Sequence, residues 1–167
     1  MFKLISKTIA AVAIVSVALF GSANAKTLKI ETHFTASSPN GEVAAQFAKN
    51  VEMFSGGSLK VEMFYSSSVT GKSAEVFNSA QTGIIDCDMT GAGYQTGKNA
   101  AFQFAGDVMG GYDNPYQQYE FLNFPGAQEA VDALYNKYGM TLIGWWIPGH
   151  ESLISSRPIP DVASLKD

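Results

Sequence analysis

The chain has 167 residues, of which 46% are hydrophobic and 12% aromatic, which is enough apolar material for one sizeable core. Its 11 basic and 15 acidic residues give a formal net charge of −4, which argues against a nucleic-acid partner. The single cysteine, Cys87, excludes an intrachain disulfide, so stability must come from packing, and we expect Cys87 to be a small buried hydrophobic residue.

The amino terminus has the pattern of a secretory signal peptide. Two lysines precede an apolar run at residues 8–20, and small residues follow it. The run is shorter than the roughly 20 residues that a membrane-spanning helix needs, so we expect cleavage between Ala25 and Lys26 rather than a membrane anchor. Losing two lysines leaves 9 basic and 15 acidic residues, and we expect this mature chain in the periplasm.

Three strands are predicted in the first part of the mature chain. Apolar and polar side chains alternate over residues 28–34, which is the period of a half-buried strand with Glu31 and His33 on its polar face. The same alternation recurs from Leu59 to Tyr65, and residues 84–89 are apolar enough to form a buried strand.

Two helices are predicted between these strands. Residues 37–40 are of the types that begin helices, apolar side chains then recur at helical spacing, and two glycines at 56–57 end the pattern. A second helix is expected over residues 73–82. Because parallel strands need a crossover that returns the chain, this order predicts an α/β sheet with parallel connections.

The second part of the chain is predicted to be mainly helical. Asn114 is a good helix cap and Pro115 suits the first helical position, so a short helix is expected as far as about Leu122. Apolar residues between 127 and 138 give the cleanest amphipathic pattern in the chain. Residues 140–147 are predicted to form another strand.

The common enzyme motifs are missing from the sequence. Gly91 and Gly93 follow a predicted strand, but Thr96 stands where a dinucleotide-binding fingerprint needs glycine. No nucleophile elbow, Cys-x-x-Cys or His-Glu-x-x-His motif is present. Asp86 and Asp88 share one face of a strand and could form a metal pair, but solvated or capping carboxylates are the preferred interpretation.

Several segments resemble a known family of binding proteins. Residues 47–51, 81–86, 155–159 and 161–166 are similar to the solute-binding subunit, DctP type, of tripartite ATP-independent periplasmic (TRAP) transporters. Residues 94–98 and 144–152 look most like the branch that binds 2-oxo acids and related small carboxylates. These segments span nearly the whole mature chain.

The resemblance implies a fold of the periplasmic binding protein type II kind, in which two lobes close on a ligand. Residues 26–148 would form most of the first lobe, and residues 149–167 would cross into the second. Family members continue past this point into a strand whose arginine pairs with the substrate carboxylate. The resemblance also implies delivery of the ligand to a membrane permease, with no enzymatic activity and no cofactor other than a sodium or calcium ion that would bridge the ligand.

The resemblance and the positions of residues at strand ends together predict which residues form one side of the ligand cleft. Open α/β sheets bind ligands beyond the carboxyl ends of their strands. The expected substrate-binding residues are His33, Tyr94, Gln95, Trp145, Trp146, His150 and Glu151. Histidine at position 150 departs from the glutamine common in the 2-oxo-acid branch. Any metal ligands are expected beyond residue 167.

The leading hypothesis is thus capture of a small 2-oxo or 2-hydroxy carboxylate for transport. Within the same family the ligand could instead be a dicarboxylate, sialic acid or ectoine. A periplasmic hydrolase is the alternative from another class, and it would need a nucleophile and a base within hydrogen-bond reach. A sensor subunit that presents its ligand state to a membrane kinase would use the same fold.

Overall fold

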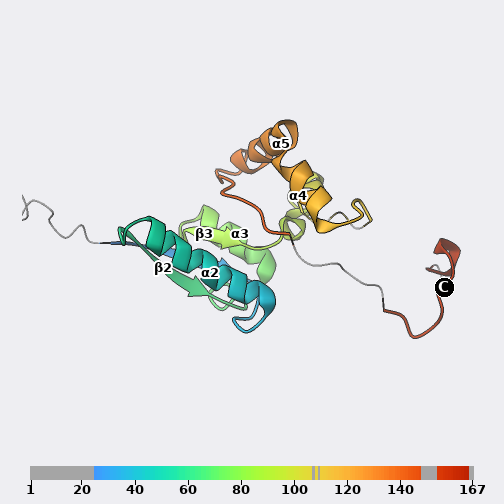
Figure 1. Cartoon of the computed structure of the whole chain (residues 1–167), viewed down its shortest axis with the longest axis horizontal. Helices are drawn as coiled ribbons and strands as arrows, with labels where there is room; N and C mark the ends of the chain where they lie inside the picture. The colour runs from blue at the N-terminus through green and yellow to red at the C-terminus, as the bar shows by residue number, and fades with distance from the viewer. Residues whose placement is uncertain (1–24, 107, 109, 148–153, 166–167) are drawn as a thin grey trace, which may run out of the picture. The chain divides into compact units, whose positions relative to one another are not determined.

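The computed structural model describes residues 25–106, 108, 110–147 and 154–165 (Figure 1). Apart from Ala25, the signal peptide expected at residues 1–25 lies outside the described residues. The described chain forms two compact units, divided in sequence between Thr90 and Gly91. Among these residues no helix is long and apolar enough to cross a membrane.

The first unit is built on a three-stranded parallel sheet in the order β2-β1-β3. The central strand β1 (Lys26–Thr32) pairs along its length with β2 (Leu59–Phe64), and its carboxyl half pairs with β3 (Cys87–Met89). The register places Glu31 opposite Asp88. This confirms the parallel α/β sheet predicted from the sequence.

Two helices make the crossovers between these strands (Figure 1). The first, α2 (Pro39–Phe54), packs on β2, and the second, α3 (Ser73–Gln81), packs on β3 and β1. From β1 the chain passes to β2 on one side, and from β2 it crosses over β1 to β3 on the other side. Right-handed crossovers in opposite directions place the two helices on opposite faces of the sheet.

The start of α2 is fixed by its cap and by a close approach of the backbone. The hydroxyl of Ser38 accepts a hydrogen bond from the Gly41 amide at 3.1 Å, and Pro39 occupies the first turn. Gly41 is buried, and a Cβ at this position would overlap the carbonyl oxygen of Thr35. Glycine is therefore required here for space.

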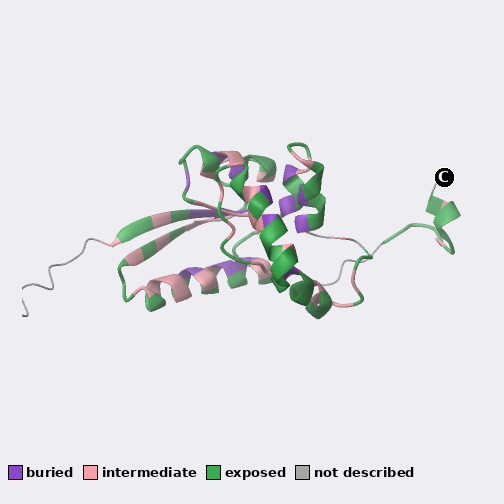
Figure 2. Ribbon diagram, turned by 90° about the horizontal axis from the view of Figure 1, so that it is seen from above, coloured by how far each residue is buried: buried purple, intermediate pink, exposed green. Residues whose placement is uncertain are grey.

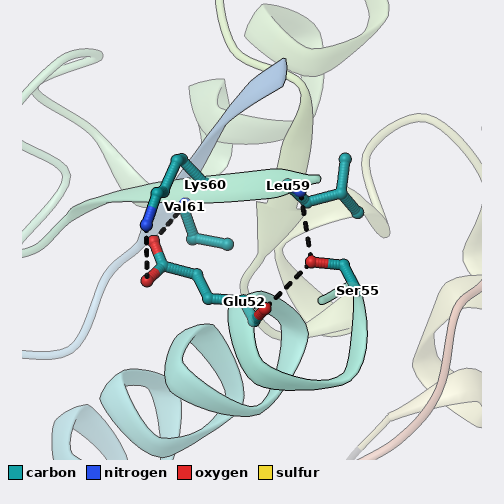
Figure 3. A network of polar contacts seen from close by, with 5 residues as sticks. All are labelled: Glu52, Ser55, Leu59, Lys60 and Val61. Atoms are coloured by element: carbon teal, nitrogen blue, oxygen red, sulfur yellow. Dashed lines mark hydrogen bonds and ion pairs between the residues drawn. The ribbon is translucent and has the colours of Figure 1, made fainter. Parts of the chain in front are cut away.

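A small polar network ties the end of α2 to the start of β2 (Figure 3). One carboxylate oxygen of Glu52 accepts from the Val61 amide at 2.9 Å, and the other lies 3.8 Å from the Lys60 ammonium. The Ser55 hydroxyl donates to the Glu52 carbonyl at 3.0 Å and accepts from the Leu59 amide at 3.1 Å. These contacts set how α2 leads into the strand.

The buried residues of the first unit gather around the carboxyl half of β1 and the facing side of α2 (Figure 2). The amino-terminal end of β1 is exposed, whereas its last three residues, from Ile30 to Thr32, are buried. The apolar members of this core are Ile30, Ala44, Ala48, Val76, Phe77 and Ile85. The most deeply buried part of the sheet therefore lies near the carboxyl ends of its strands.

The second unit is helical in its described residues. Its elements are η1 (Ala92–Gln95), η2 (Ala100–Ala105), α4 (Pro115–Asn123), α5 (Pro125–Asn136) and η3 (Val162–Leu165). The predicted cap of α4 is confirmed, because the Asn114 side chain accepts from the Gln117 amide at 3.1 Å. Phe102 is fully buried, with its ring centroid 5.2 Å from that of Tyr135.

Two sequence-based expectations about strands are wrong. Residues 140–147 are not in a strand, although their pattern favoured one. The Met140 amide is instead bonded to the Tyr135 carbonyl at the end of α5, and extended backbone becomes a strand only when a neighbouring strand pairs with it. The third strand begins at Cys87 instead of residue 84, because the Ile84 and Ile85 amides bond to the Ser79 carbonyl at the end of α3.

Candidate functional site

The carboxyl ends of the three strands lie at one edge of the sheet, as parallel pairing requires. β1 leads into His33, β2 into a loop at residues 65–72, and β3 into Thr90. We call this the carboxyl edge. Such edges are where open parallel sheets bind their ligands.

The loop at 65–72 is held in a strained conformation at this edge. Ser66 and Ser67 have positive φ angles of 57° and 51°, a region that residues with side chains seldom adopt. Their amides donate to the carbonyls of Phe34 at 2.9 Å and Thr32 at 3.1 Å. The loop is thus bonded directly to the end of β1.

The side chain of Glu31 is hydrogen-bonded to the same loop. One of its carboxylate oxygens, Oε1, accepts from the Val69 amide at 2.6 Å and the Thr70 amide at 3.3 Å. The side chain is fully buried, although alternation predicted it on the polar face of a half-buried strand. The prediction failed because Glu31 is buried by the loop at 65–72, which is far away in sequence.

Asp88 lies beside Glu31 in the register of the sheet. The pKa of Asp88 is raised to about 6, mainly by burial; the hydroxyl and amide of Thr90 lower it, and the negative charge of Glu31 adds a smaller increase. Burial also raises the pKa of the Cys87 thiol, with Asp86 and Asp88 adding to the effect.

The expectation of a solvated or capping carboxylate is confirmed for Asp86, whereas the expectations for Asp88 and Cys87 are corrected. Asp86 is exposed and caps the sheet, since its Oδ2 accepts from the Lys29 amide at 2.8 Å. Asp88 is half-buried rather than fully solvated, and Cys87 is half-buried instead of fully buried. Among the described residues no three histidine, cysteine, aspartate or glutamate side chains are placed to hold a metal ion.

The site residues predicted from the sequence fall in different places. His33 is half-buried at the carboxyl edge of the first unit, where its ring packs on Phe34 with centroids 3.9 Å apart. Tyr94 and Gln95 share η1 in the second unit. Tyr94 is 46% exposed, whereas Gln95 is only 2% exposed and is therefore poorly placed to reach a ligand from the surface.

Trp145 lines a surface pocket of about 240 Å³ in the second unit. Its other lining residues are Tyr119, Asn123, Gln128, Leu142, Ile143 and Gly144. The neighbouring Trp146 is half-buried and is not part of the lining. His150 and Glu151 lie outside the described residues.

Sequence reasoning missed Glu31, Asp88 and the two strained serines. Glu31 occupies a polar position of an alternating strand, so the local pattern gave no signal of its burial. Nothing in the sequence signals the positive φ angles, because serine rarely takes them.

Comparison with solved structures identifies the fold. A periplasmic solute-binding protein of a TRAP transporter from Rhodobacter sphaeroides, in an apo open form, matches with 26% identity and a TM-score of 0.66, over 71% of this chain and 37% of that one. One from Pseudoalteromonas atlantica, with bound sodium and pyruvate, matches with 20% identity and a TM-score of 0.63, over 70% and 35%. One from Bordetella bronchiseptica, with copurified calcium and picolinate, matches with 21% identity and a TM-score of 0.62, over 68% and 34%.

The chain therefore spans about a third of the length of these proteins. A search of curated proteins found no match. The expected solute-binding fold is confirmed, and the related proteins are receptors for solutes outside the cytoplasm, not enzymes. Residues 30–167 match the model of the DctP family, and the chain accordingly belongs to this family, the bacterial extracellular solute-binding proteins of family 7.

Proposed function

We propose that this chain is part of a receptor that captures a small 2-oxo or 2-hydroxy carboxylate and delivers it to the membrane subunits of a TRAP permease. The observation that carries the proposal is the family match over residues 30–167. Relatives that hold pyruvate with sodium and picolinate with calcium support the ligand class, since both ligands are small monocarboxylates. A sodium or calcium ion beside the ligand is part of the proposal.

The carboxylate of such a ligand needs a cationic partner when it is taken from water. Arg157 is the only arginine in the sequence, and its guanidinium donates to the Ser164 carbonyl at 2.8 Å within the carboxyl-terminal segment. We therefore propose that the partner arginine, with the metal ligands, belongs to the part of the binding protein that follows residue 167.

The aromatic wall of the site is proposed to come from the second unit and its flanking segment. Tyr94 offers a partly exposed side chain, and Trp145 an indole ring at a pocket of about 240 Å³. This volume is below the roughly 300–1,000 Å³ typical of sites for drug-sized ligands and is suited to a much smaller acid. His33, His150 and Glu151 remain candidate contacts, and Trp146, which does not line the pocket, is the less favoured of the two tryptophans. Gln95, being buried, is proposed to support η1.

We also propose that residues 1–25 direct export and are then removed. Lys26, which follows the expected cleavage position, is the first residue of β1, and its amide bonds to the Ser58 carbonyl at 3.0 Å. The mature protein would then act in the periplasm. The mass of the secreted protein tests this, since cleavage leaves Lys26 as the first residue.

A tryptophan-fluorescence titration of the full-length mature protein tests the ligand class. We expect a saturable change with pyruvate or another 2-oxo acid, with sodium or calcium present, and a weaker response to lactate and to C4 dicarboxylates. Trp145→Phe should remove most of the change, while the matched variant Trp146→Phe should keep most of it. No response to any acid, or equal responses from the two variants, would contradict the proposed site.

A further inference from the structure

Several buried polar atoms at the carboxyl edge lack a hydrogen-bond partner. Oε2 of Glu31, Oδ1 of Asp88 and Oγ1 of Thr90 are all buried without a hydrogen-bond partner. Glu31 is fully buried, and its register with Asp88 on the neighbouring strand puts the two carboxyl groups side by side on one face of the sheet. Two adjacent carboxylates, each with one buried oxygen that lacks a donor, are costly to keep ionised.

A single proton on the pair would give two of these atoms a hydrogen-bond partner. If Asp88 is protonated on Oδ1, its hydroxyl can donate to Oε2 of Glu31, so both atoms gain a partner while Oε1 of Glu31 keeps its two bonds to the loop. A metal ion fits less well. Calcium takes about six to eight oxygen ligands, and the described residues bring no third carboxylate to this place.

We infer that Glu31 and Asp88 share one proton, and that this pair acts as a positioning device that holds the 65–72 loop at the carboxyl edge. The loop carries the strained Ser66 and Ser67 and is bonded to the end of β1. Losing the proton places two negative charges next to each other under this loop. The link to ligand binding rests on the proposed function, whereas the shared proton does not.

The other charged groups on the elements around the pair are Lys26 and Lys29 on β1, His33 after β1, the exposed Lys60 and Glu62 on β2, Lys72 and Glu75 at the start of α3, and Asp86 and Cys87 next to Asp88 in the chain. Lys26, Lys29, Lys72, Glu75 and Asp86 are exposed, which weakens their effect on a buried pair through solvent screening. Cys87, with a raised pKa, stays neutral over the acidic range, so His33 is the group whose titration must be separated from that of the pair.

The direction of the pH effect follows from the raised pKa of Asp88. Between the ordinary value of 3.8 and about 6, the folded chain holds a proton that the unfolded chain has released. The contribution of the protonated pair to stability is therefore complete at the acidic end and is lost as the pH rises through about 6. Asp88→Asn keeps a donor beside Glu31 at every pH and should remove this dependence.

The test is a pH titration of the full chain without ligand, followed by NMR of aspartate carboxyl carbons. We expect Asp88 to titrate near pH 6, and the Val69 amide proton to shift with the same midpoint because Glu31 accepts from it. Glu31→Gln should lower the midpoint, and the matched exposed variant Asp86→Asn should leave it unchanged. A midpoint at the ordinary value, or one that Glu31→Gln does not move, overturns the inference.

A second arm measures pyruvate affinity at pH 5 and pH 7. The added charge and the loosened loop should both weaken binding at pH 7, on the order of threefold, and Asp88→Asn should abolish this difference while any contribution of His33 persists. An equal pH dependence in both proteins would overturn the link to binding. If no acid binds at either pH, the proposed function fails, while the NMR titration still decides whether the proton is shared.

Discussion

At the scale of single residues, the fold depends on a few positions whose roles are steric or electrostatic and are not evident from residue type. Gly41 and Glu31 are examples. The glycine allows the backbone of α2 to pass the Thr35 carbonyl, and the buried glutamate bonds to a loop remote in sequence. Both lie in segments whose secondary structure was predicted correctly. What the sequence did not predict was the tertiary surroundings of these two residues.

Substituting Gly41 gives a test in which two effects have opposite signs. Alanine favours a helix interior over glycine by about 1 kcal/mol, but the added Cβ would overlap backbone atoms that cannot rotate away, at a cost of about 1–3 kcal/mol or more. We expect Gly41→Ala to lower the free energy of unfolding, measured by urea denaturation.

Gly126→Ala is the matched control. Gly126 lies in the first turn of α5, where a Cβ would meet only ordinary contacts with the Phe124 ring. Its substitution should be neutral or stabilising by a few tenths of a kcal/mol to about 1 kcal/mol. An unchanged or increased stability of Gly41→Ala would refute the steric account of α2.

At the scale of elements, the sequence pattern correctly predicted those helices and strands whose position depends on local features such as periodicity and capping residues. The strand, helix, strand, helix, strand order of the first unit follows from periodicity and from glycines and capping residues at the helix ends, and Asn114 marked the start of α4. The segment at 140–147 was mispredicted because a strand depends on a neighbour that the local pattern does not specify. The same dependence on distant segments hid the burial of Glu31.

The network at the end of α2 gives a prediction at this scale. Glu52→Ala removes the acceptor of the Val61 amide and the partner of Lys60, and should reduce the free energy of unfolding by about 1–2 kcal/mol. Glu52→Gln retains an acceptor oxygen and should cost only a few tenths, because the ion pair is partly exposed.

Thermal and urea denaturation of both variants provide the measurement. Lys49→Ala, on an exposed position of the same helix, is the control and should stay within about 0.5 kcal/mol of the parent chain. Equal losses in Glu52→Ala and Glu52→Gln would mean that the charge, and not the hydrogen bond to β2, connects α2 to the sheet.

At the scale of the whole molecule, the family model identifies a solute-binding protein, and each unit carries a candidate region for the proposed site. The sheet of the first unit supplies a carboxyl edge with a strained loop, and the second unit supplies Tyr94 and the pocket beside Trp145. The sequence indicated the family and these aromatic residues. It did not indicate the Glu31–Asp88 pair, which exists only because β1 and β3 pair in this register.

The most direct test of the exported-receptor proposal is a native mass spectrum of the full-length protein recovered from the periplasm, recorded with excess pyruvate and sodium. We predict a chain that begins at Lys26 and a population heavier by one ligand, which disappears when the protein is denatured. A chain that still begins at Met1, or a folded protein whose mass is unchanged by pyruvate and by every other 2-oxo or 2-hydroxy acid tried, would contradict the proposal.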